Sequence, residues 1–338
     1  MDLTILTSDR FADHLTPPGH PERPERATVM QFVAAECGRR GAEVVEPVPA
    51  TDRELCRVHD RDYVSSLRET AGRAIALDPD TFTSPDSYDV ACLAAGAAVG
   101  AVDHVLQKGR RTFAMVRPPG HHAERHKAMG FCLFNNVAIG AAHARAQGAQ
   151  RVAIVDFDVH HGNGTQAAFY DDPSVLFLSS HQYPYYPGSG DVAEVGAGAG
   201  AGFTVNMPLE AGATDGDLAL VYETIALPVL RQFRPDVMLV SAGFDAYEND
   251  PLGGMRLTVD GFAQLASMLV EVADECCDGK LALVTEGGYD LPGLAGSLRI
   301  VADVLGGAVV DRSAPAPTTR ARATIDAVVA EQRRFWRL

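Results

Sequence analysis

The chain has few cysteines, and they follow no pattern. Its six cysteines, at positions 37, 56, 92, 132, 276 and 277, contain no Cys-x-x-Cys pair and no regular spacing. Such a set is typical of reduced, mostly buried thiols, and it argues against a disulfide-rich secreted domain and a cysteine-based zinc site. We therefore expect a cytoplasmic protein.

Basic residues are also scarce. The sequence has 29 Lys and Arg against 44 Asp and Glu, which gives a formal net charge of −15. Direct DNA binding needs a basic surface, so the composition argues against a nucleic-acid partner. An acidic surface could steer cationic substrates toward the protein, although many cytosolic proteins are simply acidic.

Long apolar runs and linker-like stretches are missing as well. The first residues lack the basic and apolar regions of a signal peptide, and no stretch reaches the roughly 18 apolar residues of a membrane span. The sequence therefore predicts no membrane association. The 338 residues are 46% hydrophobic, enough for a large core. We expect one catalytic domain over residues 1–310, with a tail at 311–338 that forms a helix on the same domain.

Apolar strand patterns alternate with helix patterns along the chain. The predicted strands are residues 3–7, 43–48, 112–117, 152–157, 175–179, 203–208, 237–242 and 281–285. The predicted helices are residues 22–39, 87–107, 135–147, 215–232, 260–276 and 291–304. Apolar strands alternating with helices predict a three-layer αβα fold with a mostly parallel sheet of about eight strands.

The most informative segment is residues 156–164 (DFDVHHGNG), which directly follows the apolar run at 152–155. Polar residues after a buried parallel strand lie at the edge where open α/β sheets place their ligands. Asp158 and His160 are two residues apart, so both project to the same side of an extended segment. One carboxylate and one imidazole suit Zn²⁺ when a third ligand comes from elsewhere and one position stays open for water. The segment predicts a catalytic metal site.

Three further polar segments follow predicted strands. They are residues 117–124 (RPPGHHAE), 241–245 (SAGFD) and 286–289 (EGGY). Because all of them follow the C-terminal ends of strands, one crevice could collect them. Asp245 would then complete an Asp₂His set with Asp158 and His160, and a zinc ion in such a set lowers the pKa of its bound water to about 7.

The remaining residues of these segments supply acid–base groups for amide hydrolysis. One of the adjacent His121 and His122 can take the water's proton and return it to the leaving amine, while the other stabilises developing charge. Asp156 and Asn163 are candidate orienting partners, and the Tyr289 hydroxyl could donate to the oxyanion. From the residues alone, Asp156 could equally cap the strand end and Tyr289 could be a packing residue.

These segments together resemble the histone deacetylase family. The resemblance rests on residues 118–124 with 130–132 (GFC), 156–166, 241–245 with 250–254 (DPLGG), and 286–289, in that order. Residues 19–26 (GHPERPER) and 58–64 also resemble the N-terminal part, so the similarity covers residues 14–305. It implies the arginase/deacetylase fold. The segment 161–166 (HGNGTQ) resembles class II deacetylases and acetylpolyamine amidohydrolases rather than class I.

The resemblance also implies roles for individual residues. The implied zinc ligands are Asp158, His160 and Asp245, and the implied catalytic residues are His121, His122, Asp156, Asn163 and Tyr289. In that set His122 would be the general base and acid, and His121, paired with Asp156, its electrostatic partner. The same ligands accept Fe²⁺, so the metal is left open between Zn²⁺ and Fe²⁺.

Substrate and ion sites are implied in the same way. The implied substrate-binding residues are Asp80, Gly130, Phe131, Tyr186, Leu252 and Gly288, and Arg26 matches the arginine of an internal acetate channel. A structural K⁺ site is implied at Asp156, Asp158, His160, Ser179 and Ser180.

The substrate remains open between two classes. Polyamine-selective enzymes of this architecture carry a glutamate at the position of Leu252, and residues 7–26 are too short for the dimer-forming insertion of some acetylpolyamine amidohydrolases. We therefore favour acetyl-lysine peptides or proteins as substrate, with acetylpolyamines as the alternative and a homo-oligomer left open. A two-metal ureohydrolase and a non-catalytic acyl-lysine-binding module are weaker hypotheses, because the chain offers one ligand set and fills every acid–base position.

Overall fold

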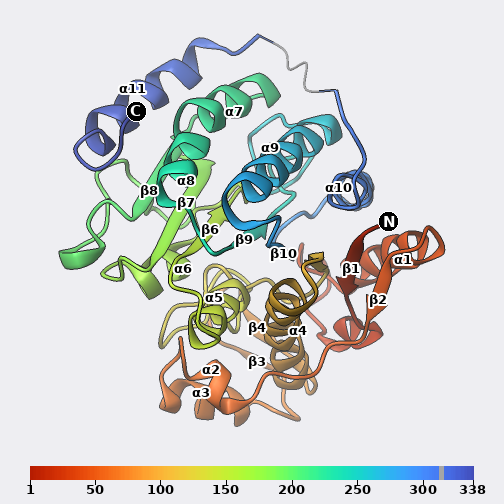
Figure 1. Ribbon diagram of the computed structural model, residues 1–338. Coiled ribbons are helices and arrows are strands. Elements are labelled where there is room, and N and C mark those ends of the chain that lie inside the picture. The colour runs from red at the N-terminus through yellow and green to blue at the C-terminus, as the bar shows by residue number, and fades with distance from the viewer. Residues whose placement is uncertain (312–315) are drawn as a thin grey trace.

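The centre of the protein is an eight-stranded sheet between two layers of helices. The computed structural model describes residues 1–311 and 316–338 (Figure 1). The strands are β1 (Leu3–Leu6), β2 (Glu43–Val45), β5 (Arg111–Ala114), β6 (Val152–Asp156), β7 (Val175–Gln182), β8 (Thr204–Leu209), β9 (Val237–Ala242) and β10 (Leu281–Thr285). All of them are parallel, in the order β2-β1-β5-β10-β9-β6-β7-β8. The predicted three-layer α/β fold is confirmed.

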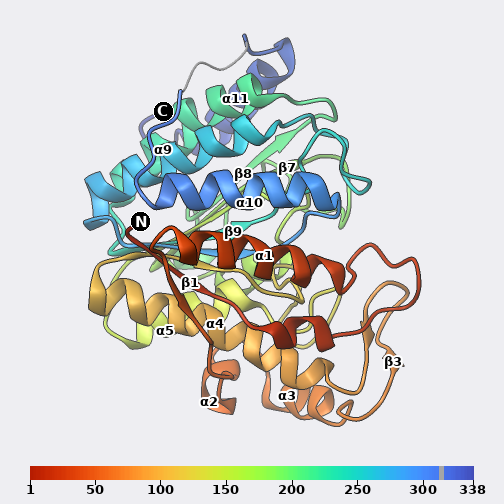
Figure 2. The same cartoon turned by 90° about the vertical axis from the view of Figure 1, so that its right-hand side faces the viewer.

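Both faces of the sheet are apolar, which is why its strands lack a polar alternation. In β6, Ala153 and Val155 pack into one core cluster, whereas Val152 and Ile154 pack into another on the opposite face. The first face is covered by α1 (Glu25–Arg39), α7 (Asp215–Val221), α8 (Leu227–Phe233), α9 (Val259–Cys277) and α10 (Leu291–Leu305), and the second by α4 (Ser87–Lys108) and α5 (Asn136–Ala146). Figures 1 and 2 show these two layers.

The observed elements differ from the predicted ones mainly at their ends. The strand predicted at 43–48 ends at residue 45, while the one predicted at 175–179 continues to residue 182. The helix predicted at 215–232 contains a π-helical turn, η3 (Tyr222–Ala226), between α7 and α8. Helix α1 begins at residue 25 rather than 22.

Several short elements were not predicted from sequence, because they carry too few residues for a periodic pattern. They are η1 (Asp9–Asp13), α2 (Asp52–Leu55), α3 (Arg61–Arg68), β3 (Ile75–Ala76), β4 (Phe82–Thr83), α6 (Asn163–Phe169) and η2 (Gly198–Gly200). Helices α2 and α3 lie beyond α4 and α5, on the side away from the sheet (Figure 1).

The strand order gathers the polar segments. The chain skips two positions between β5 and β6, and β9 and β10 later fill them. As a result β5, β10, β9 and β6 are consecutive neighbours. The polar segments at 117–124, 286–289, 241–245 and 156–164 therefore emerge side by side at one edge of the sheet.

Two other predictions concern α4 and the tail. Helix α4 is long and apolar enough to cross a membrane, but 72% of its apolar window is buried inside the fold, as is typical of a core helix. In the predicted tail at 311–338, residues 312–315 lie outside the described residues. The following α11 (Thr319–Gln332) packs on β8, where the Thr324 hydroxyl donates to the Pro208 carbonyl.

Candidate active site

Two carboxylates and one imidazole converge where β6 and β9 end. The ligand atoms of Asp158, His160 and Asp245 lie within 4.8 Å of one another. His160 Nδ1 is 3.1 Å from Asp158 Oδ1 and 3.3 Å from Asp245 Oδ2. Burial and then the charge of Asp158 raise the pKa of Asp245 to about 7, because two carboxylates are held together out of water. A cation between them would relieve this repulsion.

The residues present fit a metal ion. Asp245 Oδ2 is fully buried and has no hydrogen-bond partner within residues 1–311 and 316–338, whereas Asp245 Oδ1 accepts from the Val159 N–H. A buried carboxylate oxygen without a hydrogen bond is costly unless a cation binds it. Two carboxylates and one imidazole are also ligand types that Zn²⁺ accepts.

Glycines give these carboxylates room. A Cβ atom at Gly243 would lie 2.0 Å from Asp158 Oδ2, and one at Gly287 would lie 1.9 Å from Asp245 Oδ2. The Gly287 N–H also donates to Asp158 Oδ2 at 2.8 Å. The glycines of SAGFD and EGGY therefore allow the backbone to approach the ligand oxygens closely.

His121 is held by a carboxylate. Its Nδ1 is 3.0 Å from Asp156 Oδ2, and its Nε2 is 3.8 Å from Asp158 Oδ1. Burial lowers the pKa of His121, but the charges of Asp156 and Asp158 outweigh burial and raise it to about 10. The two carboxylates therefore favour the protonated form of His121. Asp156 also accepts from the Asp158 N–H, and a Cβ at Gly162 would collide with it.

His122 is held by an amide instead. Its Nδ1 is 2.8 Å from Asn163 Oδ1, at the first residue of α6. Burial lowers the pKa of His122 well below its usual value, and the neighbouring His121 and His160 lower it further. The neutral imidazole then donates from Nδ1, so Nε2 is the nitrogen that can accept a proton.

Tyr289 lies across the pocket from the histidines. Burial raises the pKa of its hydroxyl well above the usual value, so it remains a donor. Its backbone N–H donates to Asp250 Oδ2 at 2.6 Å, and the Arg26 guanidinium lies over its ring, 4.9 Å from the centroid.

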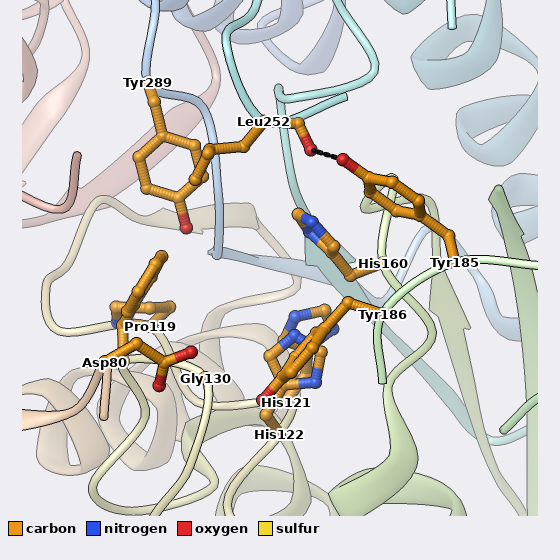
Figure 3. Close-up of a pocket in the computed structure, with 11 residues that line it drawn as sticks. Asp80, Pro119, His121, His122, Gly130, His160, Tyr185, Tyr186, Leu252 and Tyr289 are labelled. Atoms are coloured by element: carbon orange, nitrogen blue, oxygen red, sulfur yellow. Dashed lines mark hydrogen bonds between the residues drawn. The ribbon is translucent and has the colours of Figure 1, made fainter. Parts of the chain in front are cut away.

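The three imidazoles and the Tyr289 side chain line one pocket of about 200 Å³. Its lining residues are Asp80, Pro119, His121, His122, Gly130, Phe131, His160, Tyr185, Tyr186, Leu252 and Tyr289. In Figure 3, the Tyr289 hydroxyl and the Asp80 carboxylate point into the same space as the imidazole rings. All predicted substrate-binding residues except Gly288 line this pocket. The Gly288 carbonyl instead accepts from Arg26 Nε at 2.8 Å.

Aromatic rings form the pocket walls. Phe131 packs edge to face with Tyr289 at 5.7 Å between centroids, and Tyr186 does so with His122 at 5.2 Å. Phe131 has a φ of 68°, a left-handed conformation that costs energy for a bulky residue. It follows Gly130, where a Cβ would lie 2.4 Å from the His122 ring. The backbone at Gly130 therefore packs directly against the His122 ring, with no room for a side chain between them.

Arg26 belongs to a buried ion cluster behind Tyr289. Glu22 accepts from Arg26 Nη1 at 2.9 Å and from Arg117 Nε and Nη2 at 2.7 Å each. Arg26 also donates hydrogen bonds to the carbonyls of Gly288 and Glu286. In this position Arg26 is bound to the backbone on both sides of Gly287.

Of the residues predicted for K⁺, Asp156 ends β6, Asp158 and His160 follow it, and Ser179 and Ser180 lie on β7. Ser179 is paired in register with Asp156, and the Ser180 hydroxyl is 3.5 Å from the Asp156 carbonyl oxygen. Ser180 also contacts the Tyr222 hydroxyl at 3.0 Å, and Ser179 Oγ is 2.9 Å from His181 Nδ1.

Sequence reasoning missed two contributors. Glu286 lies in the EGGY motif, but only the structure shows its carboxylate accepting from the Gly120 and His121 N–H groups at 2.6 and 3.1 Å. Tyr185 stacks on the His160 ring with centroids 5.6 Å apart, and its hydroxyl donates to the Leu252 carbonyl (Figure 3). The adjacent aromatic pair at 185–186 was the available signal for Tyr185.

Known proteins resemble this chain over nearly its whole length. Residues 20–305 match the histone deacetylase domain. A probable deacetylase of Archaeoglobus fulgidus is 40% identical over 293 residues, which cover 86% of this chain and 82% of that protein. The polyamine deacetylase HDAC10 of Homo sapiens is 39% identical over 94% of this chain, which spans 49% of that protein. The crystal structure of the HDA15 HD domain superposes with a TM-score of 0.92 at 35% identity, covering 99% of this chain and 95% of that one.

Proposed function

Because the chain belongs to the histone deacetylase family, we propose that it is a zinc-dependent deacetylase of acetyl-lysine side chains in peptides or proteins. Family membership makes the chain a hydrolase that acts on amide bonds. One observation carries the finer proposal: His160 of the Asp₂His cluster, His122 and Tyr289 all line one small pocket.

The pocket residues can divide the work of amide hydrolysis. Asp158, His160 and Asp245 would hold Zn²⁺. The ion would lower the pKa of a bound water, so that the water can lose a proton and attack an amide near neutral pH. His122 presents Nε2 to accept the proton of that water and to return it to the leaving amine.

His121 and Tyr289 stabilise negative charge that develops during the reaction. His121, whose protonated form the hydrogen-bonded Asp156 carboxylate favours, stabilises the negative charge that develops as the water attacks. The Tyr289 hydroxyl, which burial keeps protonated, donates to the carbonyl oxygen as that oxygen becomes negative.

The pocket wall favours acetyl-lysine over acetylpolyamines. Leu252 occupies the position where polyamine-selective enzymes place a glutamate, and an apolar side chain offers no charge for a secondary ammonium. The aromatic rings of Phe131 and Tyr186 line the pocket, and apolar walls suit the four methylene groups of a lysine side chain.

A polyamine substrate is the second candidate, and three observations favour it. The Asp80 carboxylate points into the pocket and could bind an ammonium group (Figure 3). The protein also carries a net charge of −15, and one relative is named a polyamine deacetylase.

The substrate is tested by kcat/KM for an acetyl-lysine peptide, acetylspermidine and acetylputrescine, with zinc-loaded protein and a chelated control. We expect the peptide to be preferred and Leu252→Glu to shift the preference toward acetylspermidine by about tenfold, through a charge-assisted contact. Asp80→Asn then tests whether Asp80 binds the amine. A polyamine preference of the wild-type protein would contradict the proposed substrate, and absence of turnover on all three would contradict the proposed reaction.

The identity of the metal at the Asp₂His cluster is also part of the proposal. Loading with Fe²⁺ in parallel with Zn²⁺ tests which metal gives the higher kcat, because the Asp₂His set accepts both. We also propose K⁺ at the carbonyls around Asp156, with Ser179 and Ser180.

A further inference from the structure

The orientation of one amide decides whether His122 can act as a base. Asn163 could face His122 with either its oxygen or its NH₂ group, because the two ends of an amide have the same shape. If the NH₂ group faced Nδ1, His122 would carry its proton on Nε2, which points to the pocket. Such a tautomer could not accept a proton there.

The structure surrounds the Asn163 NH₂ group with acceptors. Nδ2 donates to Glu124 Oε1 at 2.9 Å, and it lies 3.4 Å from both the His122 carbonyl oxygen and Met129 Sδ. A carboxylate has no proton to donate, so the amide end facing Glu124 must be the NH₂ group. Glu124 makes the shortest of these three contacts and carries the only charge among them.

Hydrogen bonds of the backbone hold Glu124 in place. Its N–H donates to the Lys127 carbonyl at 2.9 Å, and its own carbonyl is 2.9 Å from His59 Nδ1. The buried His59 in turn accepts from the Asn135 N–H through Nε2, so Nδ1 carries the ring proton and donates to Glu124. Both backbone polar groups of Glu124 are thus hydrogen-bonded, the N–H to Lys127 and the carbonyl to His59.

We propose that Glu124 is a positioning residue that selects the tautomer of His122 by fixing the Asn163 amide. The chain of contacts runs from the Glu124 carboxylate through Asn163 Nδ2 and Oδ1 to His122 Nδ1, with distances of 2.9 and 2.8 Å. The proposal rests on the proposed function in one respect, namely that His122 accepts a proton at Nε2. Glu124 itself does not line the pocket.

Four proteins test this role: Glu or Gln at position 124, each combined with Asn or Asp at position 163. The test is whether Glu124→Gln lowers or raises kcat in each background. In the Asn163 background, Glu124→Gln removes the acceptor-only group and frees the amide to turn, so we expect kcat to fall by about tenfold. In an Asn163→Asp background, the carboxylates at 124 and 163 repel each other. There, Glu124→Gln should raise kcat, because a glutamine amide can donate to the carboxylate at 163.

The controls separate positioning from folding. Glu69→Gln, at an exposed position after α3, should leave kcat unchanged in both backgrounds. Metal content and Tm are measured for every variant. A loss of kcat of the same size and sign in both backgrounds would show a merely structural role for Glu124 and overturn the proposal.

A second readout does not depend on turnover. ¹⁵N NMR of the histidine side chains, with His122 assigned through a His122→Asn variant, reports which ring nitrogen carries the proton. We expect Nδ1–H in the wild-type protein and a mixture of tautomers in Glu124→Gln. Nδ1–H unchanged in that variant would overturn the proposal. Absence of deacetylation by a wild-type protein with the expected tautomer would instead contradict the proposed function.

Discussion

At the scale of single residues, His121 and His122 have adjacent rings, with centroids 4.0 Å apart, but meet different partners. Asp156, beneath His121, brings a charge that raises the pKa of the imidazole. Asn163, beside His122, brings only a dipole, and burial lowers the pKa there. Environments that push the pKa values of neighbouring groups apart suit one group to carrying charge and the other to accepting a proton.

The Tyr289 hydroxyl gives a prediction at this scale. Tyr289→Phe should lower kcat by about 100- to 1000-fold with little change in KM, because it removes one donor to the developing oxyanion. Single-turnover hydrolysis of an acetyl-lysine peptide measures the effect. Tyr170→Phe, which removes a hydroxyl at the end of α6, is the matched control. Retention of wild-type kcat in Tyr289→Phe would exclude the proposed donor role.

At the scale of elements, the turn after β10 joins four parts of the site. The Glu286 side chain accepts from the turn that carries the tandem histidines, and the Gly287 N–H donates to Asp158. The Gly288 carbonyl accepts from Arg26 on α1. The Tyr289 N–H donates to Asp250, in the segment after β9. Four consecutive residues thus set the relative positions of the proposed base, the proposed metal ligand Asp158 and the proposed oxyanion donor.

Glu22, in the segment before α1, gives a prediction about acid stability. Burial raises the pKa of Glu22, but the guanidinium groups of Arg117 and Arg26 outweigh burial and lower it to about 2, from 4.5 in an unfolded chain. A lowered carboxyl pKa stabilises the fold fully above pH 4.5, and that stabilisation is lost as the pH falls from 4.5 toward 2. The shift corresponds to about 3 kcal/mol.

Glu22→Gln tests this account. The variant leaves two buried guanidinium groups without their carboxylate, so it should lose about 3–5 kcal/mol of unfolding free energy at pH 7. Its deficit relative to the wild-type protein should shrink between pH 4.5 and 2, as measured by urea unfolding at each pH. The exposed Glu25→Gln should show neither change. A deficit that stays constant with pH would contradict the lowered pKa of Glu22.

At the scale of the whole molecule, a metal ion would tie together the ends of several strands. Asp158 follows β6 and Asp245 follows β9, and β10 contacts Asp158 through Gly287. An ion that binds only the folded chain, at a free concentration of 100 times its dissociation constant, adds about 2.7 kcal/mol to the free energy of unfolding.

We therefore predict that chelation lowers Tm by a few degrees and that added Zn²⁺ restores it, as measured by calorimetry. Asp245→Asn, which removes one carboxylate charge from the cluster, should show a much smaller zinc-dependent change. A wild-type Tm that is unchanged after the metal has been removed would argue against a metal at this cluster.

The local sequence pattern was sufficient to predict the major helices and strands. Apolar runs such as residues 152–155 and 237–242 predicted strands of the sheet, because burial on both faces requires apolar side chains at every position. Short elements such as α2 and β3 were missed because they span too few residues for a period to show.

The sequence by itself determined the family, the layered α/β architecture and the residue types that can bind a metal and move a proton. These features depend on neighbours in the chain, such as Asp158 and His160 two residues apart. Only the tertiary structure decided that β9 and β10 lie between β5 and β6, which brings Asp245 and Tyr289 to the histidines. It also decided the partners of Glu22, Glu124 and Glu286, because contacts between distant segments depend on the order of strands in the sheet, which no local pattern encodes.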